Sequence, residues 1–146
     1  EANVRVDDDI VGQIGQGLLA FVAVEPNDDD ATARRLVDRV VSYRVFGDDA
    51  GRMNLSLVDT GGELLLVSQF TLAADTRKGL RPSFTTAAAP EPGRRLFEQV
   101  VEYARAALPG KVATGRFGAD MKVALVNDGP VTFWLRFSAA TANESL

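Results

Sequence analysis

Cysteine and histidine are both absent from this 146-residue chain. Without cysteine there can be no disulfide bond, thiolate metal site or cysteine nucleophile. Without histidine the chain lacks the most common general base of enzymes, and a Ser-His-Asp triad is impossible. Any catalysis near neutral pH must therefore rest on backbone donors, carboxylates, a lysine, a cofactor or the substrate itself.

Long apolar runs and an excess of positive charge are also missing. The sequence has no stretch of about 18 apolar residues, and Glu1 to Arg5 do not resemble a secretory signal, so we expect a cytoplasmic protein with no membrane partner. The net charge of −4 argues against a protein that binds nucleic acid mainly through bulk positive charge. It leaves room for a local basic patch.

Much of the acidic charge lies in three short runs, Asp7–Asp9, Asp28–Asp30 and Asp48–Asp49. Aspartate favours turns and caps, and we interpret the runs in this way. A Mg²⁺ cluster is the alternative, but adjacent aspartates converge on one ion only where the fold brings them together. We therefore expect neither a metal site nor a cofactor.

The apolar pattern predicts one domain over residues 1–137, followed by a flexible tail at 138–146. Helical spacing predicts one helix that starts before Ala33 and ends near Gly47, and another from Pro90 to Leu108. Strands are predicted at residues 4–6, 10–14, 18–24, 54–58, 63–70, 112–117, 121–126 and 131–137. This grouping favours an α+β fold over a doubly wound parallel sheet. We expect antiparallel or mixed sheets that form a barrel-like core, with two main helices packed outside.

Four segments are unusual for plain scaffold. They are Ser68-Gln69-Phe70-Thr71 at the end of a buried strand, the basic stretch 75–82, the glycine-containing stretch 115–121, and the stretch 127–132 around Gly129-Pro130. Strand ends position groups rigidly, basic loops can contact phosphates, and glycines let the backbone approach a ligand. Each segment also has a purely structural interpretation. In the same order, these are a solvent-facing strand end, a solvated loop, a tight turn and a hairpin turn.

Taken together and in this order, the segments resemble the D-aminoacyl-tRNA deacylases, also called D-tyrosyl-tRNA deacylases. The resemblance rests on Ser68-Gln69-Phe70-Thr71-Leu72, Ala74-Asp75-Thr76-Arg77-Lys78-Gly79, Arg81-Pro82-Ser83-Phe84, Thr114 to Met121 and Asn127-Asp128-Gly129-Pro130-Val131-Thr132, with Met53 to Leu57 upstream. It implies an enzyme that hydrolyses the ester between tRNA and a D-amino acid, or glycine on a non-cognate tRNA, and so proofreads chirality.

The resemblance also assigns roles to residues. It implies a catalytic segment of Ser68, Gln69, Phe70 and Thr71, in which the backbone N–H groups of Phe70 and Thr71 form an oxyanion hole. The terminal adenine is received by Phe117, Gly118 and Met121. We further infer that three cations of the basic stretch meet acceptor-stem phosphates: Arg77, Lys78 and Arg81.

A homodimer with its active sites at the interface is a further implication. A cis Gly129-Pro130 bond from one subunit would enter the pocket of the other and act as a chiral gate. An L side chain would strike this rigid element, whereas a D residue or glycine would pass. Specificity would then come from rejection rather than from attraction to the D side chain.

A mechanism without a side-chain base suits a chain without histidine. The 2′-hydroxyl of the terminal adenosine lies beside the ester, where it can position or activate the attacking water. Thr71 as a covalent nucleophile is the rival, although no base near it can be named. Asp120 and Asp128 are the nearest carboxylates in the motifs, and we expect both to cap turns.

One departure and two alternatives accompany the resemblance. Members of the family begin with a strand of the type Met-Arg-x-Val-x-Gln-Arg-Val ahead of the segment that resembles Ala2 to Val6, and this chain lacks it. We expect this to affect one sheet edge and the support of the Gly129-Pro130 loop. The alternatives are a relative with a trans Gly-Pro that edits L-alanine on tRNA, and a non-catalytic RNA-binding module.

Overall fold

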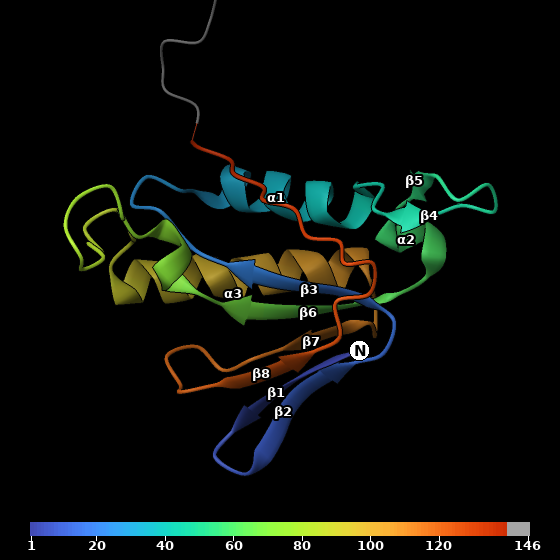
Figure 1. The fold of residues 1–146 in the computed structure, drawn as a ribbon. Helices are drawn as coiled ribbons and strands as arrows, with labels where there is room; N and C mark the ends of the chain where they lie inside the picture. Colours follow the sequence, from blue (N-terminus) through green and yellow to red (C-terminus); the bar gives the residue numbers. More distant parts are fainter. Residues whose placement is uncertain (140–146) are drawn as a thin grey trace, which may run out of the picture.

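Strand β6 (Glu63–Ser68) is the centre of the structure, a computed structural model that describes residues 1–139 (Figure 1). Residues Leu64 to Val67 are all buried, and their side chains alternate between the two faces of the strand. Leu64 and Leu66 belong to a core shared with the helices, whereas Leu65 and Val67 belong to a second core on the opposite side. Burial on both faces explains why this strand is continuously apolar.

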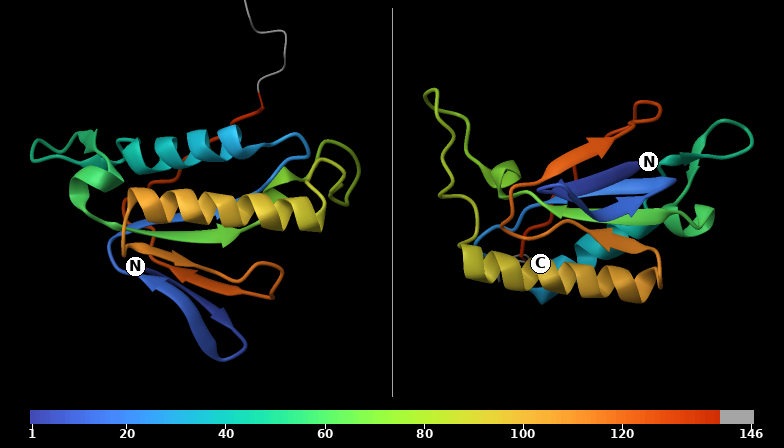
Figure 2. Two further views of the ribbon diagram at one scale, coloured as in Figure 1. Left: turned by 180° about the vertical axis from the view of Figure 1, so that it is seen from behind. Right: turned by 90° about the horizontal axis from the view of Figure 1, so that it is seen from below.

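A parallel sheet is built around β6, with β3 (Gly17–Val22) on one side and β7 (Val112–Thr114) on the other. Parallel neighbours need a crossover connection, which usually contains a helix. Helix α1 (Asp30–Ser42) lies in the connection from β3 to β6, and α3 (Pro90–Ala107) lies in the connection from β6 to β7. Both helices pack on the same face of the sheet (Figures 1 and 2).

The two helices bury the apolar stripes that the sequence predicts. In α3 the buried side chains include Phe97, Val100, Val101 and Ala104. Helix α1 starts at the Asp29 cap and ends at Ser42, before the predicted end near Gly47. Residues beyond Ser42 do not continue the helix, since Phe46–Gly47 (β4) instead pairs with Met53–Leu55 (β5).

An antiparallel sheet forms the third layer, in the order β2-β1-β8. These strands are Ala2–Val6 (β1), Asp9–Ile14 (β2) and Lys122–Leu125 (β8). Val4 and Ile14 pack onto β6 through Leu65 and Val67. Gly12 lets the layers approach, since a Cβ atom there would lie 2.3 Å from the carbonyl oxygen of Thr114.

The strand predicted at residues 54–58 is correct only as far as Leu55. Ser56 caps the short helix α2 (Leu57–Thr60) instead, in a capping box with Asp59. The Ser56 hydroxyl accepts a hydrogen bond from the Asp59 backbone N–H at 3.1 Å, and the Asp59 carboxylate accepts one from the Ser56 backbone N–H at 2.8 Å. This local pairing outweighs the strand preference of Val58.

The expected α+β domain is present, but the expected barrel is not closed. Each sheet of the described residues is open, and β3 is an edge strand. The stretch 131–137, predicted as a strand, has no ladder partner within residues 1–139. Its side chains contact α1 and the loop before it: Phe133 packs on Tyr43, Phe137 on Arg35 and Arg39, and Arg136 pairs with Glu25 at 2.6 Å.

Of the tail predicted at 138–146, residues 140–146 lie outside the described residues. Within residues 1–139, none of the helices is long and apolar enough to cross a membrane.

Candidate functional site

The three parallel strands end at the same edge of their sheet, where polar groups gather. Gln69 follows β6, and its backbone N–H donates to the Val22 carbonyl oxygen at the end of β3, at 2.8 Å. Gly115 follows β7, and its N–H donates to the Leu66 carbonyl oxygen at 2.9 Å. The segments after β6 and β7 therefore start side by side. Ligands of open parallel sheets commonly bind beyond this edge.

Two backbone donors at this edge are free. Phe70–Ala73 (η1) is a single 3₁₀ turn, in which Leu72 N–H donates to the Gln69 carbonyl oxygen at 3.1 Å. Within residues 1–139, no oxygen accepts a hydrogen bond from the amide N–H of Phe70 or Thr71. Both residues are exposed at the surface. Adjacent free amides can stabilise an oxyanion.

The hydroxyl of Thr71 faces an amide rather than a base. Gln69 Nε2 donates to Thr71 Oγ1 at 2.6 Å. A carboxamide does not take up a proton near neutral pH, so this partner cannot activate the hydroxyl for attack. The contact instead fixes the two side chains relative to each other. Ser68 is half-buried at the end of β6.

The residues expected to hold adenine lie on the neighbouring loop between β7 and β8. The Phe117 ring packs on Phe97 of α3, with centroids 6.0 Å apart, and the Arg94 guanidinium lies 4.9 Å from its centre. Met121 Sδ accepts from the Arg116 N–H at 3.4 Å. Gly118 is exposed with φ 77°, a conformation that favours glycine.

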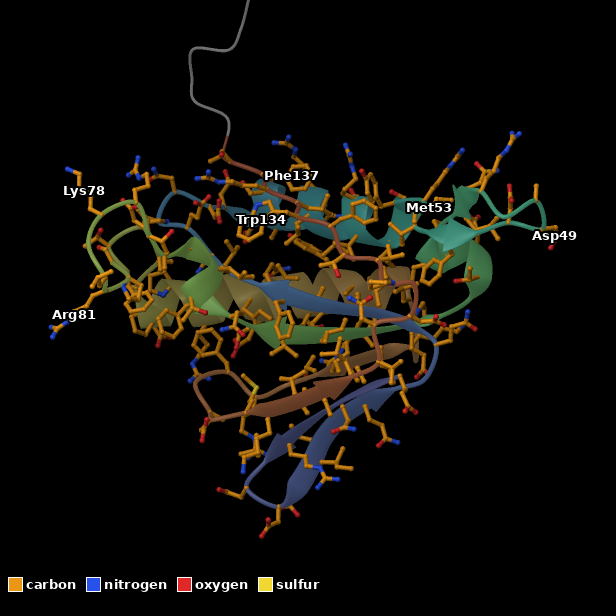
Figure 3. All side chains as sticks on the ribbon, viewed as in Figure 1. Asp49, Met53, Lys78, Arg81, Trp134 and Phe137 are labelled. Carbon is orange, nitrogen blue, oxygen red and sulfur yellow. The ribbon has the colours of Figure 1, made fainter. Side chains whose placement is uncertain are left out.

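The basic loop (residues 75–83) follows η1 and is closed at its base. Asp75 and Ser83 exchange backbone hydrogen bonds of 2.8 and 2.9 Å. The Arg77 side chain donates to both carboxylate oxygens of Asp75, and with a further bond from the Arg77 backbone N–H it holds the pKa of Asp75 well below its ordinary value. Lys78 and Arg81 have no such partner within the described residues and project from the loop (Figure 3).

Phe84 joins the site although the sequence analysis gave its side chain no role. Its ring packs against that of Phe70, with centroids 5.1 Å apart and planes at 60°. The contact links η1 to the end of the basic loop. Only the fold brings these rings together, since 13 residues separate them along the chain. The sequence signal for Phe84 is its place in the Arg81-Pro82-Ser83-Phe84 motif.

The Gly129-Pro130 bond is cis, as expected. Asn127 closes this loop: its Oδ1 accepts from the Val131 N–H at 3.0 Å, and its Nδ2 donates to Thr132 Oγ1 at 2.8 Å. Gly129 and Pro130 are exposed. Figures 1 and 2 place the loop after β8 at the opposite end of the molecule from η1. Within one chain, the segments that contain residues 68–71 and 117–121 therefore start from neighbouring strands, whereas the loop with Gly129-Pro130 lies elsewhere.

The acidic runs serve as turns and caps. The Asp29 side chain accepts from Thr32 N–H at 2.8 Å, and this bond, with a second from the Thr32 hydroxyl, lowers the pKa of Asp29. Asp48 accepts from the N–H groups of Ala50 and Arg52, both at 2.9 Å. Burial raises the pKa of Asp28. Residues 1–139 contain no group of three or more acidic side chains placed to hold a metal ion.

A groove of about 1600 Å³ runs along the open edge of β3, between α1 and residues 131–137. Its lining includes Leu72 to Arg77 at one end and Asn127 and Asp128 among the rest. Ser68 to Thr71 and Phe117 do not line it. Residues 68–71 and Phe117 therefore lie outside this groove, whereas Asp75, Arg77 and Asn127 line it.

Comparison with known proteins finds close relatives over nearly the whole chain. The chain is 66% identical over 135 residues to a D-aminoacyl-tRNA deacylase of Xanthomonas oryzae pv. oryzae (strain MAFF 311018), covering 92% of each protein. It is 64% identical over 136 residues to a D-aminoacyl-tRNA deacylase of Stenotrophomonas maltophilia (strain K279a), covering 93% of each.

Solved structures agree on the fold. A protein described as "c-Myc DNA Unwinding Element Binding Protein" superposes with a TM-score of 0.90 at 33% identity, over 94% of this chain and 93% of that one. A probable eukaryotic D-amino acid tRNA deacylase superposes with a TM-score of 0.72 at 18% identity, over 84% and 87% of the two chains, which shows a common fold alone.

The family model described as D-Tyr-tRNA(Tyr) deacylase matches residues 1–136, nearly all of the part that the structure describes. With this match and the identities above, the chain belongs to the D-Tyr-tRNA(Tyr) deacylase family.

Proposed function

We propose that this protein hydrolyses the ester bond of D-aminoacyl-tRNA and releases the free D-amino acid and tRNA. Glycine carried by a non-cognate tRNA is a second substrate. Membership of the family supports the reaction. The single structural observation that carries it is the pair of free amide N–H groups of Phe70 and Thr71 at the carboxyl edge of the parallel sheet.

The amide pair acts on the transition state. Water attacks the ester carbonyl carbon, and the carbonyl oxygen becomes an oxyanion that accepts hydrogen bonds from the Phe70 and Thr71 N–H groups. The tetrahedral intermediate then expels the ribose oxygen, which takes up the proton that the attacking water has lost. Donors of this kind are typically worth ~2.7–4 kcal/mol each.

The base for this reaction is supplied by the substrate. The 2′-hydroxyl of the terminal ribose is adjacent to the ester and positions or activates the water at high effective molarity. The proposal is supported by the environment of Thr71, whose hydroxyl contacts only the Gln69 carboxamide among the described residues. A nucleophilic Thr71 would need a proton acceptor at that place.

The adenine and the backbone phosphates of the tRNA 3′ end bind to the loops that follow β6 and β7. Phe117, Gly118 and Met121, on the loop next to the amide pair, receive the adenine. Lys78 and Arg81 meet backbone phosphates, where cations release counterions and strengthen binding. Arg77 makes a smaller contribution, because its guanidinium is already paired with Asp75.

Chirality is read by a second copy of the chain. In the proposed homodimer, Gly129-Pro130 of one subunit enters the partner's site, where it excludes L side chains. The position of this loop, far from Ser68 to Thr71 in its own chain, supports a site built from two chains (Figure 2). We place the enzyme in the cytoplasm, where aminoacyl-tRNA is formed and used.

The experiment is deacylation of D-Tyr-tRNA and L-Tyr-tRNA, with L-Ala-tRNA and Gly-tRNA as further substrates. We expect release of D-tyrosine and glycine, and L-tyrosine release slower by several orders of magnitude. Preferred hydrolysis of L-Ala-tRNA would instead identify an editor of L-alanine. Binding of tRNA without release of any amino acid would identify a non-catalytic RNA-binding protein.

A further inference from the structure

Two exposed aromatic rings stand beside the free amides. Phe70 retains 58% and Phe84 retains 42% of its accessible surface, and the rings meet at an interplanar angle of 60°. A tilted contact of this kind covers at most one face of a ring, so a flat apolar face remains open to solvent. Single exposed apolar residues need no explanation. These two rings are in contact with each other, and one of them carries a free amide, so together they form a small apolar surface next to the proposed site.

The pair lies between two parts of the proposed site. Phe70 is the residue whose own N–H faces the ester. Phe84 directly follows the Asp75–Ser83 bridge that closes the basic loop, and Lys78 and Arg81 project from that loop (Figure 3). A tRNA strand that runs from the ester toward Lys78 and Arg81 therefore passes the two rings.

We propose that the Phe70–Phe84 pair stacks the base of the nucleotide that precedes the terminal adenosine in the single-stranded 3′ end of tRNA. The inference rests on the proposed function and adds a subsite to it. Aromatic faces bind unpaired bases without regard to sequence, and neighbouring cations hold the backbone, which is the combination found in single-strand sites. The side chain of the amino acid is another conceivable occupant, and the test separates it from the base.

The experiment uses D-tyrosyl esters of two carriers, the dinucleotide CpA and a matched carrier whose 5′ nucleotide has no base. Both carriers have one phosphate, so charge is equal. For the wild-type protein we expect kcat/KM to be about tenfold or more higher with the base present, mostly through KM. In Phe84→Leu this ratio falls to near one, and in Phe84→Trp it is kept. The control is Met53→Leu, which changes an exposed side chain at the other end of the molecule and keeps the ratio (Figure 3).

Three outcomes would overturn the proposal. The first is a ratio near one in the wild-type protein, which needs no variant to fold. The second is an unchanged ratio in folded Phe84→Leu. The third is a loss of kcat/KM in Phe84→Leu that is equal for both carriers and disappears when D-alanine replaces D-tyrosine, which would assign the rings to the amino-acid side chain. Failure of the proposed function is a different result, because the wild-type protein would then hydrolyse neither ester nor D-Tyr-tRNA.

Discussion

Thr71 offers an ester two different groups, its hydroxyl and its backbone N–H. The hydroxyl accepts a hydrogen bond from Gln69, whereas the N–H has no acceptor within residues 1–139. A side-chain substitution removes the first group and leaves the second. The two roles of this residue can therefore be separated by chemistry.

We predict that Thr71→Ala keeps most of the deacylation rate of D-Tyr-tRNA. Replacement of the Thr71 amide by an ester, through incorporation of the corresponding α-hydroxy acid, removes only the N–H and should lower kcat by about 10²–10³-fold. Single-turnover rates measure both effects. A loss of more than about a thousandfold, or ~4 kcal/mol, in folded Thr71→Ala would favour a nucleophilic hydroxyl.

At this scale the sequence identifies groups but not their neighbours. Ser68-Gln69-Phe70-Thr71 and Phe117 stand out as motifs, yet the segments that carry them start side by side only because β6 pairs in parallel with β7, which no local pattern encodes. The contact of Phe70 with Phe84, and that of Phe117 with Arg94, arise in the same way. Residue types were predictable, and their contacts were not.

Among the elements, α1 and α3 are the most predictable because their signals are local. Apolar spacing fixes the buried face, and the Asp29 cap and Pro90 fix the starts. Strands depend on partners elsewhere in the chain. Residues 131–137 alternate as a strand should, but the described chain gives them no ladder, and their side chains pack on α1 instead.

The cap of α1 should make stability depend on pH in a defined direction. The pKa of Asp29 lies below its ordinary value of 3.8, chiefly because its carboxylate accepts from the Thr32 N–H. The ionised cap therefore stabilises the folded state above pH 3.8, and this contribution is lost as the pH falls through the lower folded value.

We predict that Asp29→Ala lowers the melting temperature by about 2–5 °C at pH 7. The difference from the wild-type protein should shrink as the pH is lowered below 3.8. Asp49→Ala, at the exposed turn between β4 and β5, is the matched control and should leave the melting temperature unchanged (Figure 3). Thermal melts over this pH range check both; a difference independent of pH would contradict the role of the charge.

At the scale of the whole molecule, the segment Ser68 to Thr71 and the loop that follows β8 lie at opposite ends, so the proposed site needs two copies of the chain (Figure 1). The three layers explain this separation. The parallel strands carry Ser68 and Gly115 to one edge, whereas the antiparallel β8 runs back and delivers Gly129-Pro130 to the other (Figure 1). The three sheets are open rather than closed into the expected barrel, and the two segments leave them at opposite ends.

Because the chain lacks cysteine, an introduced cysteine is the only thiol that a maleimide can modify in a cross-linking test of the dimer. We predict that Thr71→Cys and Asp128→Cys, mixed as separate proteins and treated with a short bis-maleimide, give a covalent product that joins one copy of each variant. Asp49→Cys replaces Asp128→Cys as the control and should give far less. A monomer in sedimentation, or equal yields for both pairs, would contradict insertion of the Gly-Pro loop into the partner.

The central claim is that the substrate supplies the base that this histidine-free chain lacks. Single-turnover deacylation at saturating enzyme tests it most directly, with D-Tyr-tRNA ending in adenosine compared with D-Tyr-tRNA ending in 2′-deoxyadenosine. We predict that the deoxy substrate binds but is hydrolysed very slowly, and that Asp120→Asn and Asp128→Asn retain the native rate. Equal rates for the two substrates would contradict it, and would assign the base to a carboxylate of the protein.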